Sequence, residues 1–64
     1  MTFEEAMGYV AIGEPVQRDS WDEDRMVAQG ADGSLAVHSV ASGKEIGPYS
    51  VGADGLATDW LLVA

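Results

Sequence analysis

Residues 54–63 read DGLATDWLLV, and they set a short polar segment before a dense apolar one that contains one of the two tryptophans of the chain. The apolar run from Trp60 to Val63 has no helix breaker and follows turn-forming residues, which is typical of a short buried strand. The polar residues 54–58 are predicted to form a single helical turn. Because a small fold needs its large aromatic side chains inside, we expect much of the core to gather on this stretch.

The amino-terminal residues predict the principal helix. Thr2-Phe3-Glu4-Glu5 has the form of a capping box, in which the Thr2 hydroxyl and the Glu5 carboxylate each accept from the other residue's amide. Gly13 stands where a carboxyl-terminal cap is expected. The sequence therefore predicts a helix from about Phe3 to Ile12. Its buried face is predicted to comprise the apolar positions that recur at helical spacing, Phe3, Ala6, Met7 and Val10.

The middle of the sequence has the pattern of short strands. Residues 16–18 alternate with Val16 inward, and residues 26–29 and 35–40 are predicted to form a hairpin around the Asp32-Gly33 pair. Pro48-Tyr49 suits an edge strand, because proline gives up one ladder hydrogen bond. The predicted fold class is α+β, with a small antiparallel sheet of four or five short strands and one N-terminal helix packed on it.

The length of the chain, 64 residues, is enough for one small domain, which we expect to span residues 1–64. Such a chain buries a modest share of its surface, and without cysteine it has neither a disulfide nor a thiolate metal site to reinforce it. Oligomerisation is therefore expected to add stability. The sheet face that meets the helix is predicted to contain Val16, Leu35, Val37, Leu61 and Val63.

The charge balance restricts the classes of partner. Eleven acidic residues stand against three basic ones, which gives a net charge of -8 and argues against binding DNA, RNA or an anionic membrane. A small anionic ligand is still compatible, because backbone amides and one or two arginines can hold a phosphate in an acidic protein. Glu4 and Glu5 stand where a secretory signal would carry basic residues, so the cytosol is the expected compartment.

Few residues indicate catalysis or metal binding. The acidic segment Asp19-Ser20-Trp21-Asp22-Glu23-Asp24 lacks the glycine and the distal glutamate of an EF-hand loop, so a solvated acidic loop is the better interpretation. His38 is the only histidine, and no serine or cysteine arrangement can be tied to it. The sequence therefore indicates a protein that is not an enzyme and needs no metal and no cofactor.

The aromatic residues and Arg18 carry the stronger functional indication. Trp21, Tyr49 and Trp60 lie in or beside predicted loops, and flat rings next to an arginine can stack a purine and hold a phosphate. The alternative is that these rings fill a small core. Leucine neighbours favour the core for Trp60, whereas the acidic polar surroundings of Trp21 favour a contact surface.

Three stretches of the sequence stand out together. They are, in order, Met1-Thr2-Phe3-Glu4-Glu5-Ala6-Met7, Gly13-x-x-Val16-x-Arg18-x-x-Trp21 and Asp54-x-Leu56-Ala57-x-Asp59-Trp60-x-x-Val63. They resemble three landmarks of a family of small phage proteins, the Thoeris anti-defence family of the second type. The resemblance implies a small α+β protein that assembles into a tetramer in the cytoplasm of the infected bacterial host. It also implies a sponge that binds the cyclic ADP-ribose isomer made by a bacterial TIR-domain enzyme, and in some members cyclic dinucleotides of another defence system.

The residues and the resemblance together lead to a hypothesis for the site. Trp21 is expected to stack a base, and Arg18 to take phosphate together with amides near Thr2 and Ser50. Asp54 or Asp59 would accept from ribose hydroxyls or a base amino group. If subunits meet around the first helix, the pocket is expected to be shared between chains. The predicted ligand-binding residues are Phe3, Arg18, Ser20, Trp21, Tyr49, Ser50, Asp54, Thr58, Asp59 and Trp60.

Two alternatives from other classes remain open at this point. An acidic protein-binding module could mimic the charge of DNA or inhibit a host protein through residues 19–24, with the aromatic side chains as anchors. An enzyme that hydrolyses the signal would instead turn its ligand over. Recovery of intact ligand after denaturation separates this last alternative from a sponge.

Overall fold

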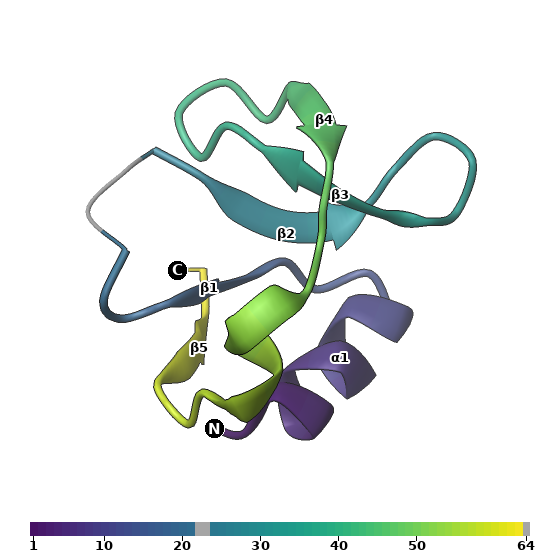
Figure 1. Cartoon of the computed structure of the whole chain (residues 1–64). Coiled ribbons are helices and arrows are strands. Elements are labelled where there is room, and N and C mark those ends of the chain that lie inside the picture. The colour runs from purple at the N-terminus through teal and green to yellow at the C-terminus, as the bar shows by residue number, and fades with distance from the viewer. Residues whose placement is uncertain (22–23, 64) are drawn as a thin grey trace.

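The computed structural model describes residues 1–21 and 24–63. One α-helix and one 3-10 helix accompany a five-stranded sheet in which every neighbouring pair is antiparallel, with the strand order β4-β3-β2-β1-β5 (Figure 1). This confirms the predicted α+β class with one N-terminal helix on a small antiparallel sheet. The elements are α1 (Phe3–Ala11), β1 (Val16–Arg18), β2 (Met26–Gln29), β3 (Leu35–His38), β4 (Glu45–Pro48), η1 (Gly52–Leu56) and β5 (Trp60–Leu62).

The capping box at the start of α1 forms as predicted. The Glu5 amide donates to the Thr2 hydroxyl over 3.2 Å, and the Thr2 amide donates to the Glu5 carboxylate over 3.0 Å. The helix ends at Ala11, one residue earlier than predicted, and Ile12 is its C-cap. Gly13 follows with a φ of 92°, a conformation that glycine adopts without a steric penalty.

The β2–β3 hairpin also forms where the Asp-Gly pair predicted it. Gly33 has a φ of 85°, and the Asp32 carboxylate accepts from the Ser34 amide over 3.0 Å and from its hydroxyl over 2.6 Å. Strand β3 ends at His38, whereas the prediction extended it to Val40. The reason is that the chain turns at once, since the Ser39 amide donates to the Lys44 carbonyl over 2.9 Å.

Strand β4 lies at one edge of the sheet, as predicted. Pro48 is tolerated there because an edge strand can do without one of the hydrogen bonds between strands. The other edge is β5, which pairs with β1. The helical turn before β5 is a 3-10 helix, and it begins at Gly52, two residues earlier than the predicted segment. Within residues 1–21 and 24–63, neither helix combines the length and the apolar character needed to cross a bilayer.

The core lies between α1 and the sheet face over β2, β1 and β5 (Figure 1). Val16 pairs with Val27, and Val27 with Val37, which places these three side chains on one face. Leu35 packs against the same core, as predicted. The fully buried cluster comprises Ala6, Val10, Val16, Val27 and Trp60.

The prediction for the last strand placed the wrong residues inward. Leu61 and Val63 are only half-buried, and the residue that enters the core from this strand is Trp60. The register explains the error: Leu62 pairs with the inward Val16, so Leu61, opposite Gln17, belongs to the other face. In a run of four apolar residues, alternation alone does not reveal which pair points inward.

Candidate functional site

Arg18 joins two acidic residues that come from different parts of the chain. Its Nε donates to Oδ1 of Asp59 over 2.8 Å, and its Nη1 donates to Oδ1 of Asp54 over 2.9 Å. Arg18 ends β1, Asp54 lies in η1, and Asp59 immediately precedes β5. The three side chains are 25%, 23% and 32% exposed respectively, so the ion pairs lie at the surface but are partly shielded from water.

Asp54 connects these ion pairs to two aromatic residues. Tyr49 donates from its hydroxyl to Oδ2 of Asp54 over 2.8 Å, and the Trp60 indole N–H donates to the Asp54 carbonyl over 3.2 Å. Burial, together with the hydrogen bond to Asp54, raises the pKa of Tyr49 well above its ordinary value. Tyr49 is therefore a neutral hydrogen-bond donor at physiological pH.

Asp59 holds the segment before β5 against the loop after β1. Its Oδ2 accepts from the Ser20 amide over 3.2 Å, and its carbonyl accepts from the Asp19 amide over 2.8 Å. The hydrogen bond from Arg18 lowers the pKa of Asp59 to about 2, with a smaller contribution from Ser20. Asp59 is therefore ionised throughout the physiological range.

An aromatic group adjoins the ion pairs. Trp21 meets Trp60 edge to face, with centroids 5.4 Å apart and an interplanar angle of 76°, and Phe3 lies 5.7 Å from Trp60 on centroids. The guanidinium carbon of Arg25 lies 4.6 Å from the centroid of the Trp21 ring, a cation–π contact. Trp60 is a core residue, whereas Trp21 is half-buried and packs against the core from the loop.

The structure brings together eight of the ten predicted ligand-binding residues, although they are distributed over most of the sequence. Ser50 and Thr58 are exposed, and among the described residues neither side chain makes a hydrogen bond in this group. Arg25 also belongs to this group, but the sequence hypothesis missed it. The only feature of the sequence that could have indicated it is its position four residues after Trp21. We call this group the arginine–aromatic cluster; it comprises Phe3, Arg18, Ser20, Trp21, Arg25, Tyr49, Asp54, Asp59 and Trp60.

Asp24, the last residue of the acidic segment, is exposed but hydrogen-bonded. Asp24 accepts from the Ser39 hydroxyl over 2.6 Å and from the Ala41 amide over 2.9 Å, and these bonds lower its pKa. It thereby fixes the turn between β3 and β4. Asp22 and Glu23 lie outside the described residues. In the part of the chain that the structure describes, no group of three or more histidine and acidic side chains is placed to hold a metal ion.

His38 lies apart from the cluster, on β3. Its Nδ1 is 3.3 Å from the Ala36 carbonyl, and its Nε2 is 4.0 Å from Oε1 of Glu45. Both neighbours belong to the β3–β4 side of the sheet, which is separated from β5 by β2 and β1. The contacts of His38 therefore join it to the far edge of the sheet rather than to Arg18.

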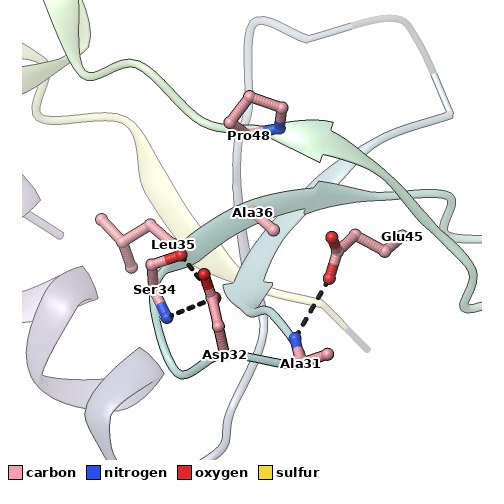
Figure 2. Close-up of a pocket in the computed structure, with 7 residues that line it drawn as sticks. All are labelled: Ala31, Asp32, Ser34, Leu35, Ala36, Glu45 and Pro48. Carbon is pink, nitrogen blue, oxygen red and sulfur yellow. Dashed lines mark hydrogen bonds between the residues drawn. The ribbon is translucent and has the colours of Figure 1, made fainter.

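A hollow of about 330 Å³ lies beside the β2–β3 turn. Figure 2 shows the residues that line it. Its two carboxylates already serve the backbone or a neighbour: Glu45 accepts from the Ala31 amide over 3.2 Å, and Asp32 accepts from Ser34. Its lining has two acidic side chains and no lysine or arginine to offset them, which makes it unsuitable for a phosphate. The hollow is lined by Ala31, Asp32, Ser34, Leu35, Ala36, Glu45 and Pro48, and none of these is a predicted ligand-binding residue.

The arginine–aromatic cluster defines a surface that combines cations, aromatic rings and paired acceptors. Such a combination suits a small ligand with both a flat base and an anionic group. In comparisons with known proteins, neither the protein-family models nor the curated proteins give a match to this chain.

Proposed function

We propose that this protein binds and sequesters cyclic nucleotide immune signals without degrading them, in the cytoplasm of a phage-infected bacterium. The proposed ligand is a cyclic ADP-ribose isomer, with cyclic dinucleotides as a second ligand class. One observation carries the proposal: the Arg25 guanidinium lies over the Trp21 ring, and Trp21 meets Trp60, the residue that pairs with Arg18 across β1 and β5. An anionic ligand with a flat base is complementary to that arrangement.

The ligand contacts follow from the donors and acceptors of the cluster. Arg18 uses Nε and Nη1 for its two carboxylates, so Nη2 can meet an incoming phosphate without breaking either ion pair. Trp21 supplies the ring for a base, and its arginine neighbour adds positive charge beside that ring. Each carboxylate oxygen has two lone pairs, so Asp54 and Asp59 can still accept from ribose hydroxyls or a base amino group.

Two titratable groups of the cluster favour binding over turnover. A general acid or base works best when its pKa lies near the working pH. The pKa of Asp59 is about 2, and the pKa of Tyr49 is raised well above its ordinary value, so neither exchanges a proton readily near neutrality. This supports the proposal that the ligand is held and released intact.

We further propose that the protein acts as a homo-oligomer, a tetramer by its resemblance, with the ligand held between chains. A 64-residue domain has little concave surface of its own, whereas a cyclic nucleotide needs to be enclosed to bind tightly. Two exposed leucines flank the cluster, Leu56 in η1 and Leu62 on the edge strand β5. Leu56 is 89% exposed, and a neighbouring chain would shield it from water.

Recovery of bound ligand tests the proposal. The purified protein is incubated with the cyclic ADP-ribose isomer, separated from free ligand, heated to denature it, and the released material is identified by mass. We expect stoichiometric recovery of the intact cyclic nucleotide. Recovery of a linear product would show an enzyme, and the absence of any co-purifying nucleotide would contradict the proposal.

A further inference from the structure

Helix α1 has two different faces. One face packs on the sheet through Ala6 and Val10. The other includes four exposed residues, the last of them the C-cap Ile12, at the i, i+3, i+4, i+7 spacing that places side chains in one row on a helix. These residues line a shallow hollow of about 300 Å³. We call this row the outer stripe; it comprises Glu5, Gly8, Tyr9 and Ile12.

The outer stripe is apolar where a solvated helix would be polar. Ile12 is 74% exposed and Tyr9 is 40% exposed, and both line the same hollow as Gly8. Glycine inside a helix is less favourable than alanine, because its backbone loses more conformational freedom on folding. A Cβ atom at Gly8 would have no neighbour within 4 Å, so contacts within the chain do not account for the missing side chain. A glycine there does leave room for a group that approaches from outside.

Charge determines which partner fits the outer stripe. Residues 1–17 contain Glu4, Glu5 and Glu14 and neither lysine nor arginine. A second copy packed on this stripe would bring two acidic surfaces together without a cation between them, which costs binding energy. Lys44 precedes β4, at the opposite edge of the sheet from β5 and outside the strands that α1 contacts (Figure 1). The complementary partner is therefore cationic.

We propose that the outer stripe binds a basic amphipathic segment of another protein. An apolar side chain of that segment fills the hollow that Gly8, Tyr9 and Ile12 help to line, and its lysine or arginine side chains face the three glutamates of residues 1–17. The stripe lies on the side of α1 turned away from the sheet, so this binding is separate from the arginine–aromatic cluster. Four residues are far fewer than the roughly 20–30 a side of a standard interface, so the expected complex is transient.

A model peptide tests this inference. The probe is a fluorescein-labelled 14-residue helix of lysine and leucine with one apolar face, titrated with the full chain in about 0.15 M salt and followed by fluorescence anisotropy. We expect the unaltered chain to bind this peptide. The same peptide with glutamate in place of lysine should not bind, because it has the charge of the stripe itself.

Substitutions distinguish binding of the peptide at the outer stripe from a general attraction of the peptide to an acidic protein. Ile12→Gln removes the apolar contact, and Gly8→Gln fills the hollow with a side chain whose Cβ meets no neighbour, so both variants should fold. We expect each to bind the peptide at least tenfold more weakly. The matched control is Ile46→Gln, because Ile46 is a similarly exposed isoleucine, 64% exposed, on β4. It should bind the peptide as tightly as the unaltered chain.

Three results would overturn the inference. The first is that the lysine–leucine peptide does not bind. The second is that Ile12→Gln and Ile46→Gln behave alike, because the attraction would then be a property of the net charge. The third is a self-association of the unaltered chain, seen by sedimentation, that Gly8→Gln abolishes, because a second copy would then occupy the stripe. Circular dichroism of each variant verifies that it folds.

Discussion

The guanidinium of Arg18 donates to the carboxylate of Asp54 over 2.9 Å, although 36 residues separate them in the sequence. This bond connects the end of β1 to η1, and the second bond of Arg18, to Asp59, connects β1 to the start of β5. The same side chain that we assign to phosphate binding therefore also closes the fold at this edge of the sheet. Stability and binding are coupled at Arg18.

We expect Arg18→Gln to lower the melting temperature at pH 7, because it leaves two neighbouring carboxylates without their cation. The loss should shrink near pH 3, where protonation of the carboxylates relieves their repulsion. Thermal unfolding followed by circular dichroism measures both. Lys44→Gln serves as the control, because Lys44 is exposed and its substitution should change stability by less than about 0.5 kcal/mol. Equal melting temperatures for the two variants would contradict a role for Arg18 in the fold.

The pH dependence of stability should report Asp59. Its pKa is lowered to about 2 in the folded protein, below the value of about 3.9 expected for an unfolded chain. Its contribution to stability is therefore fully present above the unfolded pKa and is lost as the pH falls through the folded one. We expect Asp59→Asn to be less stable than the unaltered protein at pH 6 and to lose less stability between pH 5 and pH 2. Parallel curves for the two proteins would show that Asp59 is not the group responsible.

Two glycines on the surface should respond to alanine in opposite ways. Gly8 lies in α1 with open space around its missing side chain, so Gly8→Ala should stabilise the protein by up to about 1 kcal/mol. Gly33 has a φ of 85° in the β2–β3 turn, so Gly33→Ala should destabilise it by about 1 kcal/mol or more. Chemical denaturation measures both changes. A destabilising Gly8→Ala would mean that the space over the helix is already filled by part of the protein or by a second copy.

The core assignment is tested by a pair of valines. Val27 is fully buried between α1 and the sheet, whereas Val40 is exposed in the turn after β3. Val27→Ala should cost about 2–3 kcal/mol, from the transfer of two methyl groups and the cavity left behind. Val40→Ala should cost less than about 0.5 kcal/mol. Similar losses of unfolding free energy in the two variants would contradict the register of β2 described here.

Local signals in the sequence predicted most of the fold. The capping box at Thr2, the Asp32-Gly33 turn and the edge proline Pro48 each determine the backbone through nearby atoms, and each element formed where it was expected. The inward residue of β5 was predicted wrongly because register depends on the pairing of Leu62 with Val16, two residues far apart in the chain. Val27 was not predicted as a core residue for the same reason, because its inward position depends on pairing with distant residues.

The sequence identified most residues of the arginine–aromatic cluster, but it did not predict how they contact one another. The sequence selected Arg18, Trp21, Asp54 and Asp59 for their chemistry, but it assigned the arginine and the two aspartates to separate parts of a ligand. The structure pairs Arg18 with both aspartates: the β1–β5 register brings Asp59, which precedes β5, close to Arg18, and η1 supplies Asp54. Arg25 was missed because no local sequence pattern predicts its contact with Trp21.

The central claim is that the arginine–aromatic cluster binds a cyclic nucleotide. Isothermal titration calorimetry tests it most directly, with the cyclic ADP-ribose isomer and with a cyclic dinucleotide as titrants. We predict saturable binding by the unaltered protein and by Ile46→Ala, and at least tenfold weaker binding by a folded Trp21→Ala variant. Absence of heat with both ligands, or unchanged affinity in Trp21→Ala, would contradict the account.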